Sequence, residues 1–158
     1  MSGAPFIHLR KQLTESLATV AFPEGIYVDA LKTRRDRMEV HALFAACYQQ
    51  GGGRIGGLEE WWSSISEDAE FDPALIFLAR DSNGEIIGVA HCWTSSFVKD
   101  LAVSLSHRRQ GIGTALMRHV FDHFQRRGFE AVDLKVEIHN PSGAERLYRH
   151  LGMEPVLD

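Results

Sequence analysis

Apolar side chains recur along this 158-residue chain at two spacings, which together predict alternating strands and helices. Short alternating or continuous apolar runs predict strands at residues 26–31, 74–79, 85–93, 97–103, 131–138 and 153–157. Apolar residues three and four positions apart predict helices at residues 36–50, 58–66, 112–127 and 141–150. From residue 26 onward, the predicted order is therefore β-α-α-β-β-β-α-β-α-β.

The connections between these elements predict the fold class. The strands between residues 74 and 103 follow one another through tight turns, so they should be antiparallel, whereas the strand–helix–strand unit over 97–138 should be a parallel crossover. The expected fold is α/β of the mixed α+β kind, with a mostly antiparallel central sheet and helices on both faces. The length predicts one domain over residues 1–158, with its core over 23–158.

Residues 1–22 are interpreted as an N-terminal extension in front of this core. Their apolar residues stand at helical spacing, which predicts an amphipathic helix: Phe6, Leu9, Leu13, Leu17 and Val20. The turn residues Pro23 and Gly25 then separate the segment from the first predicted strand. A contact in a homodimer is one role for such an extension.

Composition narrows the class of protein. Hydrophobic residues make up 44% and charged residues 24% of the chain, which is typical of a globular protein, and no apolar run has the length of a membrane span. A net charge of −4 argues against nucleic acid as the main partner. Charged residues interrupt the N-terminus, so a secretory signal is not expected. Cys47 and Cys92 are expected to be buried thiols in a reducing cytoplasm.

The stretch from Val98 to Met117 carries the strongest chemical signal. A predicted buried strand leads through a polar turn to Gly111 and Gly113 at the start of a helix. The first N–H groups of a helix have no partner inside it and attract anions, and glycines let a phosphate approach the backbone. Because Arg108 and Arg109 add positive charge beside the turn, the stretch predicts a pyrophosphate site.

Two histidines on the same predicted helix raise the question of a metal. His119 and His123 stand four residues apart, which is a spacing that zinc sites use. Val120, however, occupies the position of the glutamate in the zinc-protease motif, and the sequence offers no third ligand. We therefore interpret the pair as part of a solvated helix face and expect no metal.

Two motifs give the chain a resemblance to a known family. Arg108-x-x-Gly111-x-Gly113, preceded by Leu101-Ala-Val103, resembles the acetyl-coenzyme A motif of the GNAT superfamily of N-acetyltransferases. Asn140, followed by Leu147-Tyr148 and then Gly152, resembles the second motif of that family. The resemblance covers about residues 24–157. It implies transfer of the acetyl group of acetyl-coenzyme A to a primary amine of a small molecule, by direct attack in a ternary complex.

The resemblance also implies roles for individual residues. The backbone of Leu101, Ala102 and Val103 would pair with the pantetheine arm, and the Leu101 N–H would stabilise the oxyanion. Asn140 would contact the cofactor arm, and Tyr148 would face the sulfur as general acid. The remaining cofactor contacts would bind the pyrophosphate: Arg108, Arg109, Gln110, Gly111, Ile112, Gly113 and Thr114.

The sequence departs from the family where many relatives carry a glutamate base, because Ser95, Ser96 and Phe97 stand there instead. Asp100 is the base candidate taken into the site, with Glu137, His91 and a water chain as alternatives. The chain also stops before the family's usual last strand. That edge of the sheet should be completed either by the N-terminal extension or by a second subunit.

The acceptor side is expected where the first two helices meet the central strands. Glu59 and Glu60, next to two tryptophans, suit a cationic amine held against aromatic rings. The candidate substrate-binding residues are Trp61, Trp62, His91, Trp93 and Phe97. Two other functions stay open at this point: an acetyltransferase for protein N-termini or lysines, and a non-catalytic module that binds acyl-coenzyme A.

Overall fold

A mixed seven-stranded sheet forms the centre of the molecule, in the order β2-β3-β4-β5-β6-β1-β7. The structure, a computed structural model, describes residues 5–50, 55–138 and 143–157. Neighbouring strands are antiparallel, except that β5 and β6 are parallel. The strands are β1 (Phe6–Gln12), β2 (Tyr27–Ala30), β3 (Ile76–Arg80), β4 (Ile86–Trp93), β5 (Phe97–Val103), β6 (Ala131–Glu137) and β7 (Glu154–Pro155).

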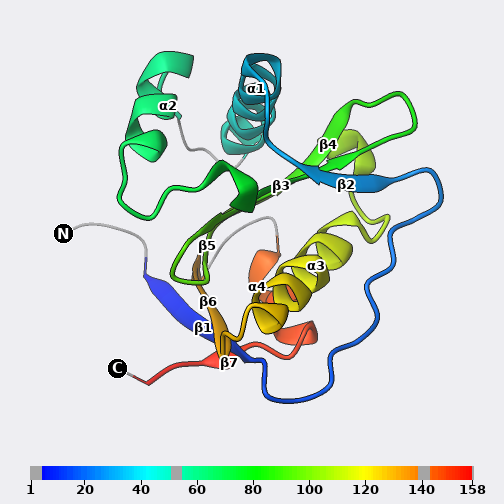
Figure 1. Ribbon diagram of the computed structural model, residues 1–158, viewed down its shortest axis with the longest axis vertical. Coiled ribbons are helices and arrows are strands. Elements are labelled where there is room, and N and C mark those ends of the chain that lie inside the picture. Colours follow the sequence, from blue (N-terminus) through cyan, green and yellow to red (C-terminus); the bar gives the residue numbers. More distant parts are fainter. Residues whose placement is uncertain (1–4, 51–54, 139–142, 158) are drawn as a thin grey trace.

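Helices cover both faces of this sheet, as Figure 1 shows. The helices are α1 (Arg34–Gln50), α2 (Leu58–Ser66), α3 (Ile112–Arg126) and α4 (Ala144–His150), with short 3₁₀ turns η1 (Pro73–Leu75) and η2 (Leu105–His107). The α1 and α2 layer has its own core, which includes Phe44 and Trp61. The α3 and α4 layer has a second and larger core, which includes Leu116 and Tyr148.

The N-terminal segment differs from its prediction. Residues 6–12 form strand β1 rather than a helix, and β1 pairs along its whole length with β6, from Phe6 opposite Glu137 to Gln12 opposite Ala131. The widely spaced apolar residues fit either structure, and the free edge of β6 decides between them, because strand propensity depends on pairing partners. β1 also pairs with β7, so the N-terminal segment itself continues the sheet beyond β6.

The other predicted elements are confirmed in type and order, with small shifts at their ends. Strand β5 and helix α2 have the predicted bounds. The predicted last strand is reduced to Glu154–Pro155. Because β1 precedes everything else, the observed order is β-β-α-α-β-β-β-α-β-α-β.

Strands β5 and β6 separate soon after they meet. Their parallel pairing comprises only Phe97 opposite Asp133 and Val98 opposite Leu134. On its other edge, β5 stays paired with β4 as far as Val103. The second half of β5 therefore has a backbone edge that no neighbouring strand of the described chain uses.

A β-bulge marks the point of separation. His91 of β4 lies opposite Asp100, whereas the next residue, Cys92, lies opposite Val98, so Lys99 is the extra residue on β5. A bulge bends its strand and increases the local twist. The bulge at Lys99 thus helps to turn the second half of β5 away from β6.

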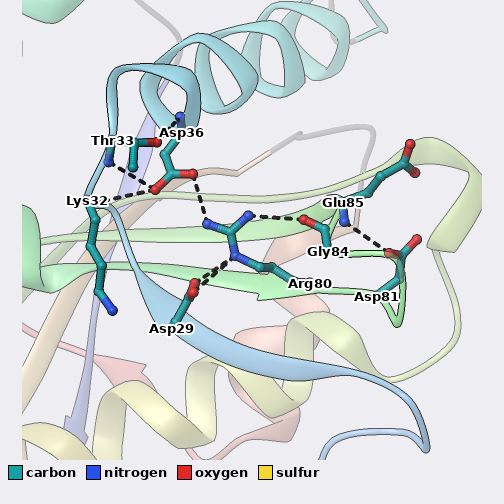
Figure 2. Close-up of polar contacts among 8 residues, drawn as sticks. All are labelled: Asp29, Lys32, Thr33, Asp36, Arg80, Asp81, Gly84 and Glu85. Atoms are coloured by element: carbon teal, nitrogen blue, oxygen red, sulfur yellow. Dashed lines mark hydrogen bonds and ion pairs between the residues drawn. The ribbon is translucent and has the colours of Figure 1, made fainter.

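A polar network fixes the start of α1 against the sheet (Figure 2). The Arg80 guanidinium donates to Asp29 at 2.9 Å, to Asp36 at 2.9 Å and to the Gly84 carbonyl at 3.0 Å. Asp36 also accepts from the Lys32 and Thr33 N–H groups, and Thr33 Oγ1 accepts from the Asp36 N–H, as in a capping box. The network holds α1, whose other end reaches the candidate site.

The histidine pair on α3 also differs from its prediction. His119 and His123 are partly buried, and both rings pack edge-on against Phe77, at centroid distances of 4.8 and 5.1 Å. Burial lowers the pKa of both imidazoles. The solvated-face interpretation is therefore wrong, because the aromatic side chain of Phe77 covers this part of the helix.

Across the described ranges, no helix combines the length and the apolarity that crossing a bilayer requires.

Candidate active site

The free backbone edge of β5 is the first part of the site. The Ser104 N–H donates to the Ile87 carbonyl of β4 at 2.8 Å. Successive strand residues direct their backbone groups to opposite edges, so Leu101 and Val103 direct theirs away from β4 and toward the opening beside β6. An extended ligand could pair with these groups as an added strand does.

The N-terminus of α3 lies at the end of that edge. Gly111 has a left-handed conformation, with φ of +82°, and no side chain caps the helix. The first bond of the helix runs from the Ala115 N–H to the Gly111 carbonyl at 3.0 Å. The N–H groups of residues 112–114 therefore stay available to bind something else. A Cβ at position 111 would meet nothing within 4 Å, so the turn is open there. This geometry fits a phosphate group.

The two arginines beside the turn differ in their contacts. Arg108 Nε donates to the Val103 carbonyl at 3.4 Å, and another nitrogen of the same guanidinium lies 3.8 Å from Cys47 Sγ. Arg109 is exposed and has a positive φ of 64°. Arg109 and Gly111 thus both bend the backbone in the left-handed sense, and successive turns of this kind form anion-binding concavities.

Asp100 lies at the centre of the side-chain part of the site. Its Oδ1 accepts from the Tyr48 hydroxyl at 2.6 Å, and its Oδ2 accepts from Lys99 Nζ at 2.8 Å. Burial raises the pKa of Tyr48 well above its ordinary value, and the Asp100 carboxylate raises it further. Tyr48 therefore stays protonated and holds one oxygen of Asp100 in place.

Tyr148 approaches Asp100 from the other face of the sheet. It belongs to the α3 and α4 core and is 7% exposed. Burial raises the pKa of its phenol strongly, and the charge of Asp100 contributes to the same shift. Within the described ranges the Tyr148 hydroxyl makes no hydrogen bond, so its proton is free to be donated.

A cavity of about 320 Å³ opens on the α1 and α2 side of Asp100. Helices α1 and α2, the loop before α2 and strand β5 all contribute to its wall. Its lining residues are Tyr48, Ile55, Gly56, Glu60, Trp61, Ser64, Lys99 and Asp100. The volume is within the range of small-molecule sites, and the wall offers carboxylates, hydroxyls and an indole ring.

His91 lies on the same face as Asp100, because the two residues are register partners on β4 and β5. It is 1% exposed, and neither ring nitrogen has a hydrogen-bond partner in the described chain. Burial lowers its pKa to about 4, although the nearby Asp100 carboxylate acts in the opposite direction. The imidazole is therefore neutral at ordinary pH.

The aromatic candidates divide into those at the cavity and those away from it. Trp61 lines the cavity, although it is mostly buried among the α1 and α2 core. The ring of Trp62 already makes a cation–π contact within the chain, because the Arg37 guanidinium lies 3.9 Å from the ring centroid. Trp93 packs against His91 at 4.7 Å, and Phe97 faces Trp93 at the far end of the β4–β5 pair.

The structure thus brings Asp100 and Trp61 together at one cavity. Leu101 and Tyr148 belong to the core on the other face of the sheet. His91, Trp93, Phe97 and Trp62 are not among the described residues that line the cavity. Asn140 lies outside the described residues. Sequence reasoning did not single out Tyr48 and Lys99. Tyr48 stands four residues after Phe44, on the face of α1 that meets the sheet. The sequence signal that could have identified Tyr48 is a side chain with a polar end on an otherwise apolar helix face.

Comparison with known proteins gives consistent results. A sequence model described as the acetyltransferase (GNAT) family matches residues 37–153. The mycothiol acetyltransferase of Clavibacter michiganensis subsp. michiganensis is 38% identical over 111 residues, which are 67% of this chain and 34% of that protein. The chain therefore spans about a third of the length of this curated relative.

Solved structures share the fold. A GCN5-related N-acetyltransferase from Sphaerobacter thermophilus has a TM-score of 0.81 and 26% identity, over 96% of this chain and 48% of that chain. The ribosomal-protein-S18-alanine N-acetyltransferase from Escherichia coli has a TM-score of 0.65 and 22% identity, over 84% and 79% of the two chains. Because the Escherichia coli enzyme is only 22% identical to this chain, its likeness concerns the fold alone.

Proposed function

Because the chain belongs to the acetyltransferase (GNAT) family, we propose that it is an N-acetyltransferase that transfers the acetyl group of acetyl-coenzyme A to a primary amine of a small molecule. One observation carries the proposal. The opening between β5 and β6 presents the edge of β5 at Leu101 and Val103, which no strand of the described chain pairs with, and it ends at the open glycine turn of α3. The Val103 carbonyl on this edge accepts from Arg108 and Cys47, and both are side chains that a ligand could displace. A ligand with an extended amide arm and a pyrophosphate matches both parts.

The described residues fit such a cofactor. The backbone of Leu101 and Val103 would pair with its arm, and the N–H groups of residues 112–114 would bind its pyrophosphate, with Arg109 adding charge. Bound acetyl-coenzyme A would supply an activated acetyl thioester at Leu101. The Leu101 N–H would be the donor for the acetyl oxygen, and a fixed donor of this kind is worth about 2.7–4 kcal/mol as negative charge develops.

Two side chains would accept and donate protons during the reaction. Asp100 is the proton acceptor on the amine side, because its carboxylate lines the cavity and the Tyr48 hydroxyl fixes it at 2.6 Å. Tyr148 is the proton donor on the sulfur side, because a phenol is protonated at neutral pH and its hydroxyl makes no hydrogen bond within the described chain. Proton acceptor and proton donor thus lie on opposite faces of the sheet.

The acceptor is proposed to be a small molecule. The cavity beside Asp100 is closed on two sides by α1 and α2 and has the volume of a small-molecule site. The relative named as a mycothiol acetyltransferase supports the same class of acceptor, although the chain spans only part of its length. Within this proposal, the acceptor amine enters beside Asp100 from the α1 and α2 face.

The experiment is to incubate the protein with acetyl-coenzyme A and a panel of small amines and short peptides, and to follow the release of free thiol. We expect turnover with small amines. Turnover with peptides alone would assign the protein to protein acetylation. Binding of coenzyme A without turnover on any acceptor would make the protein a non-catalytic binding module.

A further inference from the structure

Lys99 and Asp100 both line the acceptor cavity although they are adjacent in sequence. In a regular strand, adjacent side chains point to opposite faces of the sheet. The bulge at Lys99 removes this alternation, and Lys99 Nζ reaches Asp100 Oδ2 at 2.8 Å. The fold therefore places a primary ammonium group on the carboxylate that faces the cavity.

The two partners of Asp100 are held very differently. Tyr48 is anchored in α1, and its hydroxyl occupies one carboxylate oxygen at 2.6 Å. Lys99 occupies the other oxygen through a flexible side chain that is 34% exposed. Ion pairs of this exposure contribute little to stability, so the ammonium can leave while the tyrosine stays.

Charge in the cavity favours a cation in the place that Lys99 would vacate. Glu60 and Asp100 are its lining carboxylates, and Lys99 is the one cationic side chain among the described lining residues. The Glu60 carboxylate folds over Gly56 and has no ion pair in the described chain. With Lys99 withdrawn, the wall would carry two carboxylates beside the indole of Trp61.

We propose that Lys99 Nζ occupies the position of the acceptor ammonium at Asp100, and that a cationic primary amine binds by displacing it. This inference rests on the proposed function and names the acceptor class of the same site. Lys99 is then a specificity-determining residue. Each cationic acceptor must compete with an ammonium that is already tethered to the cavity, whereas an uncharged acceptor has no such competition at Oδ2.

The same residue would assist product release. After acetylation the acceptor nitrogen is a neutral amide, and it has lost the charge that held it to Asp100. Once Asp100 has released to solvent the proton that it accepted from the amine, the tethered ammonium of Lys99 returns to Oδ2 without competition. Lys99 therefore weakens binding of the amine and favours departure of the amide.

The test uses Lys99→Met and Lys99→Arg, with Lys32→Met as a control for the change in charge. Lys32 is exposed and lies just before the start of α1, as Figure 2 shows. Tyr48 lies near the other end of that helix. The probes are butylamine, which is charged at neutral pH, and hydroxylamine, which is not. For Lys99→Met we expect the KM for butylamine to fall about two- to fivefold, the factor that an exposed ion pair supplies.

The KM for hydroxylamine should change less than the KM for butylamine. Lys99→Arg keeps a cation at Oδ2, so it should not lower the KM for butylamine. Lys32→Met, outside the cavity, should behave like the wild type. An unchanged or higher KM for butylamine in Lys99→Met would overturn the inference and leave Lys99 as a residue that merely orients Asp100. Calorimetric titration of butylamine into the protein with coenzyme A present gives the same comparison without turnover. An absence of wild-type turnover with every amine would count against the proposed function, and the calorimetric ratio would still decide the role of Lys99.

Discussion

Tyr48 and Tyr148 approach the same carboxylate from opposite faces of the sheet, and they differ in what their hydroxyls do. Tyr48, on α1, donates to Asp100 at 2.6 Å. Tyr148, on α4, is more deeply buried, and its hydroxyl makes no hydrogen bond within the described ranges. In both, burial is the main cause of a raised pKa and Asp100 adds to it.

The comparison separates two properties that are easily confused. A raised pKa keeps a phenol protonated, but it does not decide whether the proton is available. Tyr48 has already given its hydrogen bond to Asp100, so its role is to position that carboxylate. Tyr148 retains its donor, so it is the tyrosine that can supply a proton during the reaction. The variants Tyr148→Phe and Tyr48→Phe each remove one of these two hydroxyls.

The largest expected effect is that of Tyr148→Phe. The substitution keeps the ring in the α3 and α4 core and removes only the hydroxyl. We expect kcat to fall about 100-fold with little change in affinity for the cofactor, because general acids contribute about 10²–10⁴-fold. The loss should be smaller with a thioester whose thiol leaves more easily. Full activity in the Phe variant would reduce Tyr148 to a core aromatic.

Tyr48→Phe should have a smaller effect, and this effect should concern the acceptor amine rather than acetyl-coenzyme A. It removes the hydrogen bond that fixes Asp100 Oδ1. Hydrogen bonds to charged groups are worth about 1.5–3 kcal/mol, and partial exposure reduces this, so we expect the acceptor KM to rise about tenfold. The KM for acetyl-coenzyme A should stay the same. A loss of kcat as large as that of Tyr148→Phe would mean that the two tyrosines are not functionally distinct.

His91 should contribute more to the pH dependence of stability than to activity. Its pKa is about 4 in the folded protein and near 6.5 when exposed, so the unfolded chain binds the proton first as the pH falls. Stability is fully present above pH 6.5 and decreases as the pH falls toward 4, by roughly 3 kcal/mol in all. The charged groups facing His91 are Asp100, Lys99 and Asp68.

His91→Leu should remove this contribution, because leucine suits the buried site and has no nitrogen to leave unpaired. Denaturant unfolding between pH 4 and pH 7 should show a flatter profile than the wild type. His150→Leu, at an exposed position, is the matched control and should keep the wild-type profile. We expect kcat to change much less than in Tyr148→Phe. If the pH dependence of stability in His91→Leu equals that of the wild type, His91 is not a buried neutral imidazole in the folded protein.

Most of the fold could be predicted because its elements carry local signals. Helix 58–66 and strand 97–103 have sharp boundaries in the pattern of apolar residues, and both appear with those bounds. The first strand could not be predicted in this way. Residues 6–12 become a strand because β6 and β7 lie on either side, and a partner distant in sequence leaves no local pattern.

The residues of the candidate site differ in the same way: some carry a local sequence signal and others do not. The glycine turn of α3 is contiguous in sequence, so its glycines and arginines could be identified together. The contact between Tyr48 and Asp100 joins residues 52 positions apart, and the contact between Lys99 and Asp100 depends on a bulge. Neither contact follows from spacing along the chain, because each exists only once β5 has bent away from β6.

The most direct test of the account is calorimetric titration of coenzyme A into the Gly113→Glu and Gly113→Ala variants. A Cβ at this position makes only ordinary contacts, 3.5 Å from Leu147 and 3.6 Å from Val103, so the Ala variant should bind normally. A glutamate in the first turn suits the helix dipole but repels a pyrophosphate. We predict a folded Glu variant whose affinity is at least about 100-fold weaker. Equal affinity in the two variants would contradict the assignment of this turn as the cofactor site.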